Sequence, residues 1–202
     1  MLGKTRDDAE AVAADVRAGA ANGGRVETGE SSGAPIADEL VVLAVYYPDA
    51  RSIVEQYAEG LSGKTVVDIT NPVNETYDAL VTPPDGSAAQ ELAKAAPGAR
   101  VVKAFNTTFA RTLTQGAVAG QPLDVLIAGD DENAKRQLAQ LVESSGLRPI
   151  DVGPLHRARE LEALGLLHIT LQNTLGTGFM SAVNPLTPSP NHRRLARLAS
   201  LA

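Results

Sequence analysis

The sequence predicts an α/β protein with a doubly wound parallel sheet, and two observations lead to this fold class. The run LVVLAV at residues 40–45 has six apolar residues and no charge, which is typical of a strand buried on both faces of a parallel sheet. Strand-like and helix-like segments also alternate along the chain. This alternation favours a parallel sheet that is covered by helices.

The elements before this buried strand are predicted from local signals. Residues 1–3 have the character of a strand end, and Asp7 and Asp8 lie at the positive end of a helix expected over 7–18. The apolar face of this helix is expected at Ala11, Val12, Val16 and Ala20. The remaining segments here are a glycine pair at 23–24, a weak strand at 25–28 and a loop or short helix at 29–37.

After the buried strand, helices and strands continue to alternate. The expected elements are a helix at 49–59, a strand at 64–69, a long loop at 73–86, a helix at 87–96, a strand at 100–105 and a short helix at 108–114. Ser87 and Gln90 have the spacing of a capping box, which places a helix start at Ser87. Pro97 and Gly98 end that helix.

The last part of the chain contains the longest helical pattern. The expected elements are a strand at 123–128, a helix capped by residues 129–131, a strand at 148–152 and a helical run at 155–174. The helix after residue 131 is expected to pack through Ala134, Leu138, Leu141 and Val142. The apolar positions of the long run are Leu161, Leu164, Leu167, His168 and Leu171. This stripe either packs on the sheet or forms a dimer face that closes over a ligand site, and the spacing alone leaves both open.

Three strands end in segments that could line one ligand crevice. The strand at 40–45 ends at Tyr46, and similar strand ends follow at 68–72 and at 101–106. Open α/β sheets bind ligands outside the carboxyl ends of their strands. The alternative is that these are three core strands with ordinary polar exits.

Composition excludes several classes of protein. The formal net charge of −6 gives no support for a nucleic-acid or anionic-membrane surface. Because the chain has no cysteine, it has no disulfide framework, thiolate zinc site or thiol nucleophile. No stretch approaches the ~20 apolar residues of a membrane helix. The first residues also lack the apolar core of a signal peptide, so we expect a cytoplasmic protein.

Several motifs resemble one family. The matching segments, in order, are MLGKTR, LAVYYPDA, DITNPV, VKAFNT, DVLIAGDD, GLRPIDVGPL and RARELEALGLLHITLQ, and they span roughly residues 1–178. Together they resemble the NADP-dependent coenzyme F420 reductase family (NADP oxidoreductase, coenzyme F420-dependent). The resemblance implies a Rossmann-like domain that binds NADP(H), hydride exchange with the deazaflavin coenzyme F420 or another small-molecule acceptor, and a homodimer.

The start of the chain departs from this family. The family opens with a strand, a G-x-G-x-x-G turn and a helix, whereas no such turn follows any predicted strand here. We therefore expect Met1 to be an internal methionine of a longer protein, with roughly 25–30 residues upstream. The strand at 40–45 would then lack a neighbour, and the part before Gly24 would not be bonded to the main sheet. The alternative function is a non-catalytic remnant that binds NADP weakly or acts only through dimerisation.

The resemblance, together with residue chemistry, assigns a nucleotide site. Lys4, Thr5 and Arg6 follow the first strand, where two cations and a hydroxyl suit a 2′-phosphate; a solvated basic turn is the alternative. The other cofactor-binding candidates are Ala44, Val45, Tyr46, Asn71, Pro72, Val73, Ala104 and Asn106. Asparagine amides both donate and accept, which suits a ribose or carboxamide, although an Asn-Pro pair also starts turns.

No residue is assigned as an acid–base catalyst, and no metal site is expected. The three histidines, His156, His168 and His192, have no ligand spacing. This pattern fits hydride transfer between two cofactors, because the rings then carry the chemistry. We expect an NADP-binding domain at 1–152, a helical segment at 153–184 that forms an acceptor wall or dimer face, and a mobile tail at 185–202.

Overall fold

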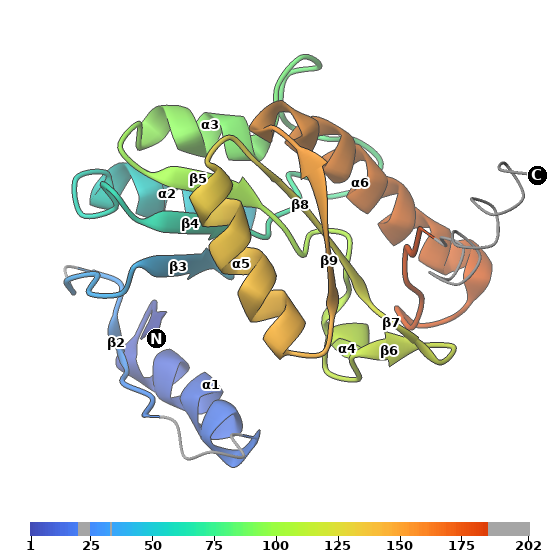
Figure 1. Cartoon of the computed structure of the whole chain (residues 1–202), viewed down its shortest axis with the longest axis horizontal. Coiled ribbons are helices and arrows are strands. Elements are labelled where there is room, and N and C mark those ends of the chain that lie inside the picture. The colour runs from blue at the N-terminus through green and yellow to red at the C-terminus, as the bar shows by residue number, and fades with distance from the viewer. Residues whose placement is uncertain (20–24, 33, 186–202) are drawn as a thin grey trace, which may run out of the picture.

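A mixed five-stranded sheet forms the centre of the described part of the chain, which comprises residues 1–19, 25–32 and 34–185 of the computed structural model (Figure 1). Its strands, in spatial order, are β3 (Leu40–Leu43), β4 (Thr65–Asp68), β5 (Arg100–Lys103), β8 (Asp124–Gly129) and β9 (Arg148–Gly153). The α/β class is therefore confirmed.

One pairing in the sheet differs from the purely parallel arrangement that the sequence predicts. β3, β4 and β5 are parallel, as are β8 and β9, but β5 and β8 are antiparallel. Lys103 pairs with Ala128, so β8 begins beyond the carboxyl end of β5. The connection holds only short elements: α4 (Ala110–Leu113), β6 (Ala117–Val118) and β7 (Gln121–Pro122). Because it does not cross back over the sheet, the next strand runs in the opposite direction.

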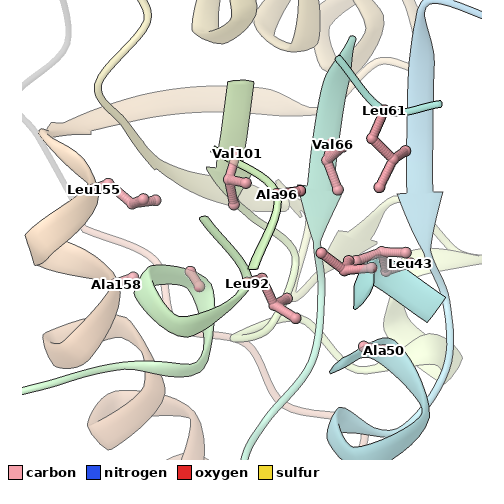
Figure 2. Close-up of a cluster of buried hydrophobic side chains, with 11 residues drawn as sticks. Leu43, Ala50, Leu61, Val66, Leu92, Ala96, Val101, Leu155 and Ala158 are labelled. Atoms are coloured by element: carbon pink, nitrogen blue, oxygen red, sulfur yellow. The ribbon is translucent and has the colours of Figure 1, made fainter. Parts of the chain in front are cut away.

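Helices cover both faces of the sheet (Figure 1). They are α2 (Tyr47–Tyr57), α3 (Ala88–Ala95), α5 (Glu132–Ser144), the 3₁₀ turn η1 (Leu155–Arg157) and α6 (Ala158–Leu175). Side chains alternate across a strand, so Val66 and Val101 pack with α2 and α3, while Val67 and Val102 pack with α5. Figure 2 shows the first of these clusters, in which Leu92 is fully buried. Each fully buried valine or leucine contributes about 1.5–3 kcal/mol.

A small N-terminal unit lies beside the main sheet (Figure 1). It consists of β1 (Leu2–Gly3), α1 (Arg6–Gly19) and β2 (Gly29–Glu30), and β1 and β2 form their own two-stranded parallel sheet. The expectation that this part is not bonded to the main sheet is confirmed. Its contacts with the main body include an ion pair from Lys4 to Asp49 and a hydrogen bond from the Tyr57 hydroxyl to the Ser31 carbonyl.

Three sequence predictions in this region are wrong. The strand at 40–45 was predicted to be buried on both faces, whereas Val42 is 46% exposed; the separate prediction that this strand lacks a neighbour is confirmed, because β4 is the sole partner of β3 in the described sheet. The face of α1 that packs carries Ala9 and Ala13, while Val12 and Val16 are exposed. The second strand lies at 29–30 and not at 25–28, because Leu2 and Gly3 of β1 pair with Gly29 and Glu30. The predicted positions 20 and 23–24 lie outside the described residues.

Most other elements begin and end within a few residues of their predicted positions. α2 starts at Tyr47, two residues early, because Pro48 is accommodated in its first turn. Ser87 caps α3 by accepting a bond from the Gln90 amide. Leu141 of α5, predicted to be buried, is 46% exposed. In the described ranges, the helices lack the combination of length and apolar character needed to cross a bilayer.

Candidate functional site

The carboxyl ends of β3, β4 and β5 lie side by side at one edge of the sheet. These strands are adjacent and parallel, so the segments 44–46, 71–73 and 104–106 leave the sheet at the same edge. The predicted crevice segments are therefore brought together by the topology. In open α/β sheets this edge is the usual place for a ligand.

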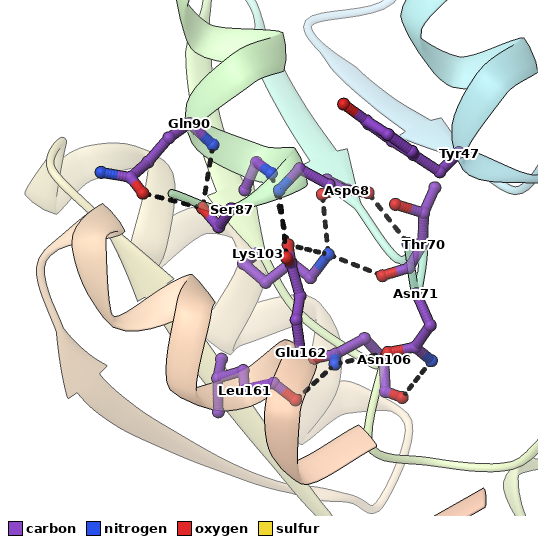
Figure 3. A network of polar contacts seen from close by, with 12 residues as sticks. Tyr47, Asp68, Thr70, Asn71, Ser87, Gln90, Lys103, Asn106, Leu161 and Glu162 are labelled. Atoms are coloured by element: carbon purple, nitrogen blue, oxygen red, sulfur yellow. Dashed lines mark hydrogen bonds and ion pairs between the residues drawn. The ribbon is translucent and has the colours of Figure 1, made fainter. Parts of the chain in front are cut away.

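A buried ion network lies directly beneath this edge (Figure 3). The Lys103 ammonium donates to Asp68 Oδ2 at 2.8 Å, to the Thr70 carbonyl oxygen at 2.6 Å and to Glu162 Oε1 at 2.9 Å. The side chains of Lys103, Asp68 and Glu162 are all 0% exposed. A lysine ammonium has three N–H donors, and all three are used here.

Glu162 also caps the beginning of α3. Its carboxylate accepts from the backbone amides of Ala88 at 3.0 Å and Ala89 at 3.4 Å. Burial raises the pKa of the Glu162 carboxyl, and the neighbouring Lys103 ammonium opposes this change. The network holds two carboxyl groups and one ammonium, so the positive end of α3 supplies part of the balancing charge.

Two asparagines join the strand ends to α6. Asn71 Nδ2 donates to the Asn106 carbonyl oxygen at 2.8 Å, and Asn106 Nδ2 donates to Asn71 Oδ1 at 3.0 Å and to the Leu161 carbonyl oxygen at 2.8 Å. A Cβ added at Gly165 would lie 2.4 Å from Asn71 Oδ1. Glycine at this position therefore lets α6 lie directly on the strand ends.

The residues at the ends of β4 and β5 leave polar atoms that suit a polar ligand. Thr70 Oγ1 and Asn106 Oδ1 are buried and have no hydrogen-bond partner within the described residues. Buried polar groups normally have a partner, so both atoms would gain a bond from a bound ligand or water. Phe105, between β5 and Asn106, has a φ of 61°, which is uncommon for a bulky residue and frequent at functional sites. These observations suit a polar ligand at the strand ends, and its assignment as a nicotinamide nucleotide stays a prediction.

The remaining strand-end candidates differ in exposure. Ala44 is exposed, Val45 is half-buried and Tyr46 is 79% exposed. Pro72 is buried and Val73 is half-buried. Ala104 is fully buried in the cluster under α5, so its side chain packs in the core. Their assignment to a nucleotide stays a prediction.

Tyr47, which the sequence analysis did not select, is buried beside the network (Figure 3). Its hydroxyl donates to the Glu91 carboxylate, and burial together with this bond raises the pKa of the phenol. The Tyr47 hydroxyl therefore joins the beginning of α2 to α3.

Two of the three residues predicted to bind a 2′-phosphate have carboxylate partners. The Thr5 hydroxyl donates to Asp8 Oδ2 at 2.7 Å and accepts from the Asp8 amide at 3.1 Å. Lys4 Nζ lies 3.0 Å from Asp49 Oδ2. Arg6 is exposed and begins α1, so its guanidinium has access to a ligand.

His168 is a core histidine with partners. Its Nδ1 lies 3.2 Å from the Thr107 carbonyl oxygen, its Nε2 lies 2.8 Å from Ser181 Oγ, and its ring lies 4.3 Å from that of Phe109. Burial lowers the pKa of this imidazole. In the part of the chain that the structure describes, no group of three or more acidic or histidine side chains is placed to hold a metal ion.

Sequence reasoning missed the residues that organise this site: Asp68, Lys103, Glu162 and Gly165. A usable signal was present for two of them, because Asp68 and Lys103 end apolar strands, TVVD and RVVK. A charge next to a buried strand requires a partner. The partner Glu162 is far along the chain, and no local pattern identifies it.

Comparisons with known proteins agree with this arrangement. No family model matches the chain. It is 33% identical over 150 residues to the F420-dependent NADP reductase of Methanocaldococcus jannaschii, covering 69% of this chain and 66% of that protein. It is 35% identical over 128 residues to the metalloreductase STEAP3 of Rattus norvegicus, covering 63% of this chain and 25% of that protein.

A solved structure extends the likeness to the fold. The crystal structure of a protein from Arthrobacter sp. FB24, provisionally described as an F420-dependent NADP reductase, is 30% identical with a TM-score of 0.71. The match covers 79% of this chain and 75% of that one.

The fold and the comparisons together define a Rossmann-like α/β domain of the class found in NADP reductases. Within this class, the chain belongs to the F420-dependent NADP reductase family. It spans 66% of the length of the archaeal reductase and 25% of that of the rat metalloreductase.

Proposed function

We propose that this protein is an NADP(H)-dependent reductase that exchanges hydride between nicotinamide and the deazaflavin coenzyme F420 or a related acceptor. The observation that carries the proposal is the meeting of the β3, β4 and β5 ends at one edge of the sheet, in a member of this reductase family. The name of the archaeal relative supports NADP and coenzyme F420 as the reacting pair.

The chain offers distinct groups for the two ends of the nucleotide. Arg6 is exposed at the start of α1 and would bind the 2′-phosphate. Lys4 would join it by exchanging Asp49 for the phosphate, since that ion pair is exposed and weak. The nicotinamide end would lie against the backbone of 44–46, with Asn71 and Asn106 at the neighbouring strand ends.

The proposed reaction requires no acid–base catalyst from the protein. The chemistry that a bound nucleotide supplies is hydride transfer from C4 of its nicotinamide to C5 of the deazaflavin. The chain contributes binding, orientation and exclusion of water. In this proposal α6 forms one wall of the space for the acceptor, because its Leu161 turn lies directly on the strand ends.

The test measures reduction of coenzyme F420 by NADPH through the loss of deazaflavin absorbance. Titration of NADPH fluorescence measures binding of the nucleotide in the same preparation. We expect micromolar affinity for NADPH and NADPH-dependent loss of the absorbance. Binding of NADPH without reduction of F420 would reject the acceptor while leaving the nucleotide assignment intact.

A second candidate is a non-catalytic protein with weak nucleotide binding. It is favoured by the lack of a G-x-G-x-x-G turn after any strand of the given sequence, because that turn and the following helix N-terminus normally hold the pyrophosphate. The same NADPH titration separates the two. An affinity in the micromolar range rejects this second candidate, because it requires weak binding of the nucleotide.

We also propose that a second copy of the chain packs on α6. Leu167, Leu171 and Leu175 are 56%, 39% and 52% exposed, although Leu161 of the same helix is buried. A helix that is apolar on both faces normally packs on both. Leu171→Glu should convert a dimer to a monomer in analytical ultracentrifugation, and a monomeric wild-type protein would reject the proposal.

A further inference from the structure

One turn of α6, formed by Leu161, Glu162 and Gly165 and here called the docking turn, holds the helix on the strand ends. Leu161 accepts from Asn106, and Glu162 accepts from Lys103. Gly165 brings the helix backbone close enough that an added Cβ would overlap Asn71. A backbone hydrogen bond, a buried ion pair and a close packing contact therefore all hold this turn of α6 on the strand ends.

Lys103 connects β4, β5 and α6. From the end of β5 its ammonium bonds the end of β4 through Asp68 and Thr70, and it bonds α6 through Glu162 (Figure 3). The contact with Glu162 is 2.9 Å long. A displacement of α6 by about 1 Å would stretch it beyond hydrogen-bond length. The network is therefore sensitive to the distance between α6 and the sheet.

We propose that Lys103 is a positioning residue which, through Asp68 and Glu162, fixes the position of α6 on the strand ends and so the position of the wall that α6 presents to the hydride acceptor. The inference rests on the proposed function, in which α6 forms one wall of the acceptor site. Lys103 itself touches no ligand, because its three N–H groups are taken by protein oxygens.

The test needs a variant that removes the network without leaving a buried unpaired charge. Lys103→Met alone would leave two buried carboxylates unbalanced, whereas removing all the charges of a buried network together is often tolerated. We therefore combine Lys103→Met with Asp68→Asn and Glu162→Gln. The matched control removes an exposed ion pair of α2, by Arg51→Met with Glu55→Gln.

The expected result separates positioning from a purely structural role. In the triple variant, the KM for coenzyme F420 should rise about tenfold or more, because a displaced α6 loses contacts with the bound acceptor and about 1.4 kcal/mol of binding is a factor of ten. The dissociation constant for NADPH, from fluorescence titration, should stay close to the wild-type value. A purely structural role would instead lower kcat through a smaller folded fraction and leave KM unchanged, which would overturn the proposal.

A second readout does not depend on the reaction. Amide hydrogen exchange over α6 (Ala158–Leu175) should accelerate about tenfold in the triple variant, while exchange over α5 stays as in the wild type. If the wild-type protein reduces no F420, the proposed function has failed, and this readout still tests whether the network holds α6 on the strand ends. Unchanged exchange over α6 would overturn it.

Gly165→Ala provides a variant of the same turn without any change of charge. Its added Cβ should push the docking turn away from Asn71, so the KM for coenzyme F420 should rise as in the triple variant. If the triple variant does not fold, this variant carries the test. A wild-type KM together with wild-type exchange over α6 would contradict the proposal.

Discussion

Ion pairs of nearly the same length occupy opposite environments in two regions of the molecule. At the strand ends, Lys103 lies 2.8 Å from Asp68 and both side chains are 0% exposed. In the N-terminal unit, Lys4 lies 3.0 Å from Asp49, but the side chains are 73% and 39% exposed. The energy of an ion pair depends on what surrounds it when one partner is lost. Bond length alone therefore does not identify the important pair.

The apolar side chains of the two regions show the same contrast. Val66, Val67 and Val102 of the main sheet are almost fully buried. Val12 and Val16 of α1 are 54% and 43% exposed. The main sheet thus forms the stable body of the described chain, and the N-terminal unit adds few buried side chains to it.

The largest expected effect comes from breaking the buried pair alone. Lys103→Met should destabilise the protein by about 3–5 kcal/mol, because two buried carboxylates lose their ammonium. Lys4→Met, at the exposed pair, should cost below about 1 kcal/mol. Urea unfolding of both variants measures the difference. Equal losses would show that the contrast in burial has no energetic meaning.

A smaller effect is expected from the docking turn. Gly165→Ala should destabilise by about 1–3 kcal/mol, because overpacking at this contact requires α6 to move. The matched control is Gly19→Ala at the end of α1, where an added Cβ meets nothing within 4 Å. It should be neutral or slightly stabilising, since alanine is the better helix former. Thermal unfolding that ranks the two variants in the reverse order would contradict the packing at Gly165.

The N-terminal unit should matter for nucleotide choice more than for stability. Arg6→Gln should weaken NADPH binding about tenfold or more, the loss expected for one charge-assisted hydrogen bond. NADH binding should not change, because NADH has no 2′-phosphate. Arg17→Gln, at the other end of α1, is the control. An equal loss for NADH and NADPH would place the 2′-phosphate elsewhere.

The smallest expected effect is a dependence of stability on pH. The folded-state pKa of His168 is lowered by burial, so the unfolded chain binds more protons just below the ordinary histidine pKa of about 6.5. This contribution to stability is present above that pH and is lost as the pH falls through this window. The melting temperature should therefore fall less between pH 7 and pH 5 in His168→Gln than in the wild type. An identical pH dependence would show that His168 is not buried in its neutral form.

The sequence predicted the architecture because local signals specify it. Asp131 caps α5 as expected, accepting from the Ala134 amide at 2.8 Å. The strand ends meet because parallel strands with alternating helices have few possible arrangements. The apolar runs did not predict the exposed side chain of Val42 or the reversal at β8, although the lack of a second neighbour for the strand at 40–45 was predicted.

The candidate site was predicted only in outline. Its edge and its backbone segments followed from the strand pattern, but the Lys103 network depends on Glu162 and Gly165, which are distant in sequence. The helical spacing of α6 did not distinguish its buried Glu162 from a solvated charge. The domain boundary at residue 152 stays a prediction, and nearly all of the predicted tail at 185–202 lies outside the described residues.

The most direct test of a nucleotide site at the strand ends is amide hydrogen exchange of the protein with and without NADPH. The nucleotide should slow exchange in all three strand-end segments, 44–47, 70–73 and 104–107, and leave α5 unchanged. Binding of NADPH with no slowing at these segments, or no binding at millimolar concentration, would contradict a nucleotide site at this edge of the sheet.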